Sequence, residues 1–90
     1  PTASQRLAEV LLDLGVRCGD KTGREIDLSV RFTHQVLADL AGAHRATATT
    51  LINDWLYDGV IGTKPNGCFQ LLKPQELWAL AGYDVKEPTE

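Results

Sequence analysis

The stretch from Thr33 to Ile61, THQVLADLAGAHRATATTLINDWLYDGVI, decides the fold of this chain. Apolar residues recur at helical spacing in its first part, and Gly42 follows them where a left-handed residue would end a helix. A longer apolar stripe predicts a second helix over about 44–58, which Gly59 would end in the same way. Two helices joined by a tight glycine turn form a helix-turn-helix, which indicates contact with DNA. The two stripes consist of Val36, Leu37, Leu40 and Ala41, and of Ala48, Leu51, Ile52, Trp55 and Leu56.

The residues before this stretch predict one helix and one strand. We expect Ser4 to cap the helix and Gly15 to end it in a left-handed conformation. Residues 16–23 contain two glycines and little pattern, which indicates a loop or a short strand. Residues 25–32 alternate strictly between apolar and polar side chains, which predicts a half-buried strand. The apolar stripe of the helix consists of Leu7, Val10, Leu11 and Leu14.

The residues after the stretch predict a β-hairpin and a short helix. Within residues 60–72 the pair Asn66-Gly67 favours a tight turn, because both residue types tolerate a positive φ. Pro74 suits the start of a helix, and residues 84–90 indicate a polar tail. The whole order is helix, strand, helix-turn-helix, β-hairpin and short C-terminal helix. It predicts an α+β winged helix-turn-helix with the hairpin as the wing.

Length and composition limit the class of protein. Ninety residues allow one small core, so we expect a single domain over 1–90, and the start at Pro1 indicates a fragment of a longer protein. Cys18 and Cys68 lie outside any metal-ligand spacing, which predicts reduced thiols, with a redox pair or metal site as the alternative. Without an apolar run of about 18 residues or a leader, we expect a cytoplasmic protein and no membrane partner.

The charge of the chain weighs against a nucleic-acid partner. The net charge is −3, whereas most nucleic-acid-binding domains are basic. Residues 33–62 carry one basic side chain, Arg45, and three acidic ones, Asp39, Asp54 and Asp58, which gives +1 − 3 = −2. The segment expected to contact DNA is therefore acidic.

The outward face of the second helix holds the candidate DNA contacts. Thr47, Thr49 and Thr50 are poor helix formers, so we expect another role for them. Their hydroxyls suit phosphates and their methyl groups suit thymine, although surface or capping threonines are the alternative. Arg45 stands at the start of this helix, within reach of a phosphate or a base edge. The face itself is centred on Ala46, Thr50, Asn53 and Tyr57.

Three further residues are candidate phosphate contacts. His34 and Gln35 lie in the first turn of the first helix of the motif, which commonly meets the DNA backbone. Lys64 lies at the tip of the predicted wing and could meet a phosphate in the flanking groove. For His34 and Lys64, simple solvation is the alternative.

The segment FTHQVLADLAGAHRATATTLINDWLYDGVI resembles the C-terminal DNA-binding domain of the Crp/Fnr family of bacterial transcription regulators. The upstream RLAEVLLDLG is similar to the helix that precedes this domain, so the resemblance covers about residues 4–82. It implies phosphate contacts by Thr33, Gln35 and Thr47 and a base contact by Arg45. The matching positions are Thr33, Gln35, Leu37, Ala38, Gly42, Arg45, Thr47, Thr49, Leu51, Gly59 and Ile61.

The resemblance also implies partners. Family members carry an N-terminal effector-binding domain and a long dimer helix, which would precede residue 1. We therefore expect a homodimer of the full-length protein on double-stranded DNA with a palindromic operator, and RNA polymerase as a candidate partner. An effector would bind the N-terminal domain, so we expect no cofactor in this one.

Three positions of the expected DNA-contacting face depart from the family pattern. Ala46 stands where the family has a glutamate, Thr50 where it has a closing arginine, and His44 where it has a small residue. Such a glutamate accepts from cytosine and such an arginine donates to guanine, and each lost contact removes about 1–3 kcal/mol of discrimination. We therefore expect a half-site richer in A·T steps, recognised through thymine methyl groups and DNA shape.

Two other classes of function compete with DNA binding. A winged helix that has lost DNA affinity could bind a protein through Tyr57, which stands beside Asp54 and Asp58. Salt-dependent binding to mixed DNA would separate this reading from the first. An enzyme is poorly supported, because neither His34 nor His44 has a carboxylate or nucleophile at the spacing of a catalytic pair.

Overall fold

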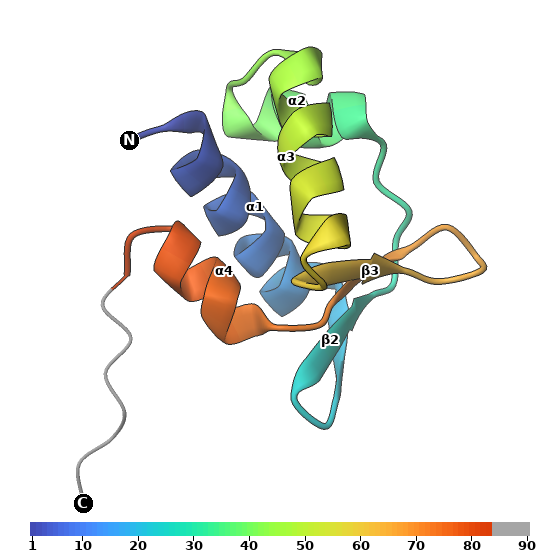
Figure 1. Ribbon diagram of the computed structural model, residues 1–90. Helices are drawn as coiled ribbons and strands as arrows, with labels where there is room; N and C mark the ends of the chain where they lie inside the picture. Colours follow the sequence, from blue (N-terminus) through green and yellow to red (C-terminus); the bar gives the residue numbers. More distant parts are fainter. Residues whose placement is uncertain (84–90) are drawn as a thin grey trace, which may run out of the picture.

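In the computed structural model, which describes residues 1–83, helices pack against a four-stranded antiparallel sheet (Figure 1). The strand order β1-β2-β4-β3 places the two hairpins side by side. The predicted α+β winged helix-turn-helix is confirmed, while the predicted tail, 84–90, lies outside the described residues. The elements are α1 (Ala3–Cys18), β1 (Gly19–Thr22), β2 (Glu25–Leu28), α2 (His34–Ala41), α3 (Arg45–Tyr57), β3 (Ile61–Thr63), β4 (Phe69–Leu71) and α4 (Pro74–Leu80).

Threonine side chains cap the first two helices. Thr2, not Ser4, is the N-cap of α1: its hydroxyl accepts from the amide of Gln5 at 3.1 Å, and its own amide donates to the Gln5 side chain. This reciprocal capping box outcompetes a cap two residues later, so the prediction for Ser4 is wrong. Thr33 is the N-cap of α2, because its hydroxyl accepts from the amide of Val36 at 3.1 Å.

The predicted end of α1 at Gly15 is also wrong. The helix continues to Cys18, and Gly15 is buried inside it. A Cβ atom at Gly15 would lie 3.1 Å from Cδ1 of Leu71, so the absent side chain lets α1 lie close against the sheet. Glycine serves here for close packing rather than for a left-handed turn.

The strand predicted over 25–32 is only half as long as expected. β2 ends at Leu28, and Val30 lies beyond it with 47% of its surface exposed. The amide and the hydroxyl of Ser29 both donate to the carbonyl oxygen of Cys18 at 2.7 Å, which turns the chain away from the sheet. Alternation alone cannot reveal this exit, because it depends on the end of α1.

The wing is part of the sheet rather than a separate ribbon. Leu71 of β4 pairs with Ile61 of β3 on one side and with Ile26 of β2 on the other. The turn of the wing is closed by the amide of Gly67, which donates to the carbonyl oxygen of Lys64 at 2.8 Å. Gly67 has φ 86°, the positive φ that its predicted turn position requires. The first hairpin therefore supports the wing.

One core joins the helices to the inner face of the sheet. Trp55 is buried in it, whereas Trp78 on α4 is 41% exposed and packs edge-to-face on Tyr83 with ring centroids 5.0 Å apart. Within residues 1–83, no helix is long and apolar enough to cross a membrane. The largest fully buried side chains are Leu7, Leu11, Leu28, Leu37, Ile52, Ile61, Leu71 and Leu77.

Candidate nucleic-acid interface

The turn between α2 and α3 sets the geometry of the helix-turn-helix. Gly42 has φ 64°, the left-handed conformation predicted for it, and the amide of Ala43 donates to the carbonyl oxygen of Ala38 at 2.9 Å. Arg6 of α1 holds the same turn: Nε donates to the carbonyl oxygen of Ala41 at 2.8 Å, and Nη2 to that of Gly42 at 3.3 Å. Carbonyl groups at a helix end lack helical partners, so Arg6 satisfies them and ties the turn to α1.

α3 has one buried and one exposed face, as its spacing predicts. Ala48, Ile52 and Trp55 pack into the core. Thr49, one of the candidate DNA contacts, is half-buried. The exposure of the outward face is confirmed, and its contact with DNA stays a prediction. The exposed side chains of α3 are Arg45, Ala46, Thr47, Thr50, Asn53, Asp54 and Tyr57.

His34 connects α2 to both α3 and the wing. Its Nδ1 atom lies 2.9 Å from the Oγ1 atom of Thr49, and its ring stacks on Phe69 of β4 with centroids 6.4 Å apart. Both His34 and Thr49 were predicted as DNA contacts. The structure brings them together, so the Thr49 hydroxyl already has a partner within the protein.

Two other side chains that were predicted to contact DNA also form hydrogen bonds within the protein. The Nε2 atom of Gln35 donates to Asp39 at 2.8 Å, and the Thr50 hydroxyl donates to the carbonyl oxygen of Ala46 at 3.1 Å. This second bond is the back-bonding that Ser and Thr commonly make within helices. His44 is the exposed N-cap of α3, and its side chain makes no capping bond.

A shallow hollow of about 370 Å³ lies between the two motif helices and the wing. Arg45 borders it from α3, and Arg31 borders it from the segment before α2. A Cβ atom at Gly67 would lie 2.9 Å from Nε of Arg31, so this exposed guanidinium lies against the wing turn. The sequence prediction missed Arg31. Its signal is a cation two residues before the N-cap Thr33, but nothing local places it beside a turn 36 residues later (67 − 31).

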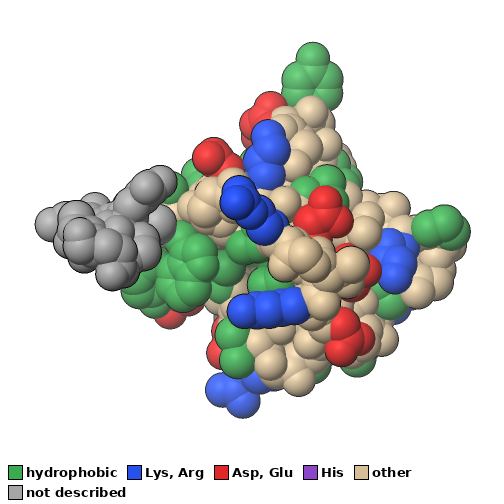
Figure 2. All heavy atoms as spheres, turned by 90° about the horizontal axis from the view of Figure 1, so that it is seen from below, with side chains coloured by type: hydrophobic (Ala, Val, Ile, Leu, Met, Phe, Trp, Pro, Cys, Tyr) green, Lys and Arg blue, Asp and Glu red, His purple; other side chains and the backbone are tan. Residues whose placement is uncertain are grey.

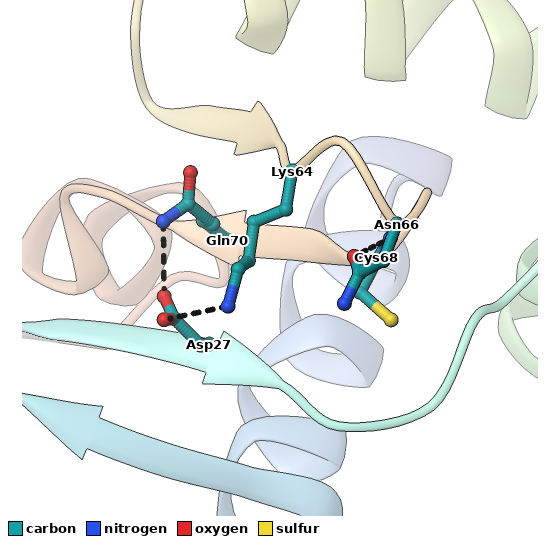
Figure 3. A network of polar contacts seen from close by, with 5 residues as sticks. All are labelled: Asp27, Lys64, Asn66, Cys68 and Gln70. Atoms are coloured by element: carbon teal, nitrogen blue, oxygen red, sulfur yellow. Dashed lines mark hydrogen bonds and ion pairs between the residues drawn. The ribbon is translucent and has the colours of Figure 1, made fainter.

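Lys64 does not extend from the tip of the wing. It is the first residue of the turn, and its Nζ atom lies 3.4 Å from Oδ2 of Asp27 on β2 (Figure 3). The same carboxylate accepts from Nε2 of Gln70 at 3.1 Å. Lys64 therefore has an acidic partner within the protein, whereas Arg31 and Arg45 have none among the ion pairs of residues 1–83.

Charges of both signs lie on the face of the molecule that is seen from below. Figure 2 shows Lys and Arg side chains interspersed with Asp and Glu side chains on this face. Residues 1–83 also contain no group of three His, Cys, Asp or Glu side chains suited to hold a metal, and Cys18 and Cys68 are free thiols. Within residues 1–83, Arg31 and Arg45 are the two basic side chains that line the hollow.

Comparison with known proteins places this architecture in a family. The family described as "Crp-like helix-turn-helix domain" matches residues 5–80. The regulatory protein CysR of Synechococcus elongatus is 42% identical over 62 residues, which cover 66% of this chain and 30% of CysR.

Solved structures agree with this match. A transcriptional regulator of the CRP/FNR family from Thermus thermophilus superposes with a TM-score of 0.72 at 30% identity, over 88% of this chain and 40% of that protein. The CO-dependent transcription factor CooA from Carboxydothermus hydrogenoformans gives the same TM-score and identity over 88% of this chain and 36% of CooA. The chain thus spans well under half of these relatives. From its match over most of its length, the chain belongs to the Crp-like helix-turn-helix family of DNA-binding domains of transcription regulators.

Proposed function

We propose that this chain is the DNA-binding domain of a bacterial transcription regulator, with α3 entering the major groove. The arrangement of Arg45 and Arg31 carries the proposal. Arg45 begins the exposed face of α3, and Arg31 lies against the wing turn on the other side of the same hollow. Recognition helices place residues near their N-terminus against base edges, while neighbouring segments contact phosphates.

The other polar residues take supporting roles in this proposal. Arg45 contacts a base edge, and Arg31 contacts a phosphate beside the wing. Thr33 and Gln35 at the start of α2 and Thr47 on α3 are further phosphate contacts, as the family resemblance implies. Thr33 caps α2 by accepting from the amide of Val36, so its hydroxyl proton would donate to the phosphate beside the backbone amides of that first turn.

Ala46 and Thr50 set the proposed sequence preference. Because its hydroxyl proton is donated to the carbonyl oxygen of Ala46, Thr50 offers the groove its methyl group and an accepting oxygen but no donor. Methyl groups suit thymine, and neither residue can form a bidentate bond to a G·C pair. We therefore propose a half-site richer in A·T than a glutamate–arginine pair would select.

The rest of the proposal concerns the longer protein. The full-length regulator would be a homodimer on a palindromic operator, with half-site centres one helical turn, about 34–36 Å, apart. An effector-binding part would lie outside residues 1–90, and RNA polymerase remains a candidate partner.

Selection from random double-stranded DNA with the full-length protein tests the proposal. We expect an inverted repeat with A·T-rich half-sites, and affinity that falls steeply with salt concentration. Recovery of a G·C-centred half-site would overturn the sequence preference. Absence of any salt-dependent binding, even at low ionic strength, would overturn DNA binding itself.

One observation favours a second function, a protein-interaction module. Tyr57 is 91% exposed at the end of α3, between the exposed acidic residues Asp54 and Asp58. A large exposed aromatic group with acidic neighbours suits a protein partner better than a phosphate backbone. If the full-length dimer fails to bind DNA at low salt, this second function gains support.

A further inference from the structure

The solvent face of the sheet carries an acidic row. Asp20 on β1 lies directly opposite Asp27 on β2, which in turn lies opposite Gln70 on β4, and Gly62 on β3 completes the row. Like charges directly opposite each other destabilise a sheet. The row therefore favours a cation that reaches Asp27.

Lys64 supplies that cation from the wing. Its Nζ atom lies 3.4 Å from Oδ2 of Asp27, while Oδ1 of Asp27 accepts from Nε2 of Gln70 at 3.1 Å (Figure 3). Relative exposures are 37% for the lysine side chain and 20% for the aspartate side chain. The pair is thus partly solvated, and a competing anion can reach the ammonium group.

The backbone beneath Lys64 is fixed. The amide of Lys64 donates to the carbonyl oxygen of Cys68 at 2.9 Å, and its carbonyl oxygen accepts from Gly67 at 2.8 Å. The side chain of Asn66 also accepts from the amide of Cys68 at 2.9 Å. Because these bonds hold the backbone of the turn, only the side chain of Lys64 can move between Asp27 and another anion.

We propose that Asp27 restrains the lysine of the wing and thereby sets how strongly the wing contributes to DNA binding. The inference rests on the proposed function, since the competing anion is a DNA phosphate. A partly exposed ion pair is weak, so a phosphate beside the wing competes with Asp27 for Lys64. A lysine that reaches a phosphate releases counterions and steepens the salt dependence. Asp27 is then a determinant of affinity that does not itself touch DNA.

Two matched variants of the full-length protein test the restraint. Asp27→Asn and Asp20→Asn each remove one negative charge from the same row, but only Asp27 contacts Lys64. Asparagine at residue 27 also keeps an oxygen for Gln70. Affinity for double-stranded DNA is measured by fluorescence anisotropy over a range of KCl concentrations. We expect Asp27→Asn to tighten binding about three- to tenfold at low salt. The plot of the logarithm of the binding constant against the logarithm of the KCl concentration should be steeper by about 0.9 per domain.

The control variant separates restraint from net charge. We expect Asp20→Asn to change affinity less than about twofold and to leave the slope unchanged, because no phosphate contact is added. Adding Lys64→Gln to Asp27→Asn should abolish the gain. Equal effects of the two aspartate variants, or a gain that survives Lys64→Gln, would overturn the inference.

A measurement without DNA keeps the inference separate from the proposed function. The acylation rate of the Lys64 amine by a small ester reagent is followed by peptide mass spectrometry. We expect faster acylation in Asp27→Asn than in Asp20→Asn, and equal rates would refute the restraint. If acylation differs but no variant binds DNA, the proposed function fails while the restraint of Lys64 stands.

Discussion

The Nδ1 atom of His34, the first residue of α2, lies 2.9 Å from the Oγ1 atom of Thr49 in the second turn of α3. The same imidazole stacks on Phe69 of the wing with ring centroids 6.4 Å apart. One side chain thus links both helices of the helix-turn-helix to the sheet. No other side-chain hydrogen bond within residues 1–83 joins α2 to α3.

Replacing His34 by alanine should destabilise the fold. The change removes a hydrogen bond, about 0.5–1.5 kcal/mol, and an aromatic contact, about 0.5–1.5 kcal/mol, so we expect a combined loss of about 1–3 kcal/mol. Urea unfolding followed by circular dichroism measures it. Gln35→Ala is the matched control, since Gln35 is exposed and bonds only to Asp39 of its own helix. A loss in the control as large as in His34→Ala would contradict the linking role.

Replacing each of the two arginines at the hollow by alanine should weaken DNA binding in a different way. Arg45→Ala should weaken binding to the selected site by about 1–3 kcal/mol and relax base preference at one position, because a base contact is lost. Unfolding free energy should change by less than about 0.5 kcal/mol, since Arg45 is exposed. Anisotropy titrations against a set of single-base variants of the site check this. Unchanged base preference would argue against a base contact.

Arg31→Ala should instead weaken binding to all sequences by a similar factor. A lost phosphate contact reduces the salt slope by about 1 per domain without changing base preference. The same titrations, repeated at several KCl concentrations, give that slope. A sequence-dependent loss for Arg31→Ala would contradict its assignment to the DNA backbone.

Two glycines with positive φ provide a test of how Arg31 is held. Gly67 (φ 86°) and Gly23 (φ 65°) both lie in hairpin turns, so alanine strains each backbone, at a cost of about 1–3 kcal/mol. A Cβ atom at Gly67 also meets the Arg31 guanidinium, whereas one at Gly23 meets nothing within 4 Å. We expect both alanine variants to lose stability, and only Gly67→Ala to alter the salt dependence of DNA binding. Equal salt slopes in the two variants would show that Arg31 does not depend on the wing turn.

Local patterns were sufficient to predict the helix-turn-helix. Gly42 and Gly59 are left-handed as expected, and the buried side of α3 follows its apolar stripe. These features depend on residues within a few positions of one another, so spacing and turn chemistry contain the required information.

Long-range packing explains what the sequence did not reveal. Gly15 lies inside α1 because a strand packs against it, not because the helix ends. Lys64 turns toward Asp27, 37 residues away, and Arg31 reaches a turn that follows it by 36 residues (67 − 31). The sheet order β1-β2-β4-β3 brings Asp27 near Lys64, and tertiary packing brings the other partners together, and no local pattern specifies either.

Arg6 bridges α1 and the turn between α2 and α3. Its guanidinium donates to the carbonyl oxygens of Ala41 and Gly42 at 2.8 and 3.3 Å, and to that of Pro1 at 2.7 Å. Hydrogen bonds from a charged donor contribute about 1.5–3 kcal/mol, so Arg6→Ala should lower the free energy of unfolding by about that amount.

Arg6→Lys should recover only part of the loss, because an ammonium group lacks the planar fork that spans two adjacent carbonyl groups. Amide hydrogen exchange shows where Arg6→Ala loosens the structure. We expect the variant to speed exchange at Ala43, whose amide bonds to Ala38 across the turn, more than at the core residue Ile52. DNA affinity should fall together with this local protection, since the turn sets the position of α3. A stability loss spread evenly over the core, with unchanged relative protection of Ala43, would instead show that Arg6 stabilises the domain as a whole and does not hold the turn.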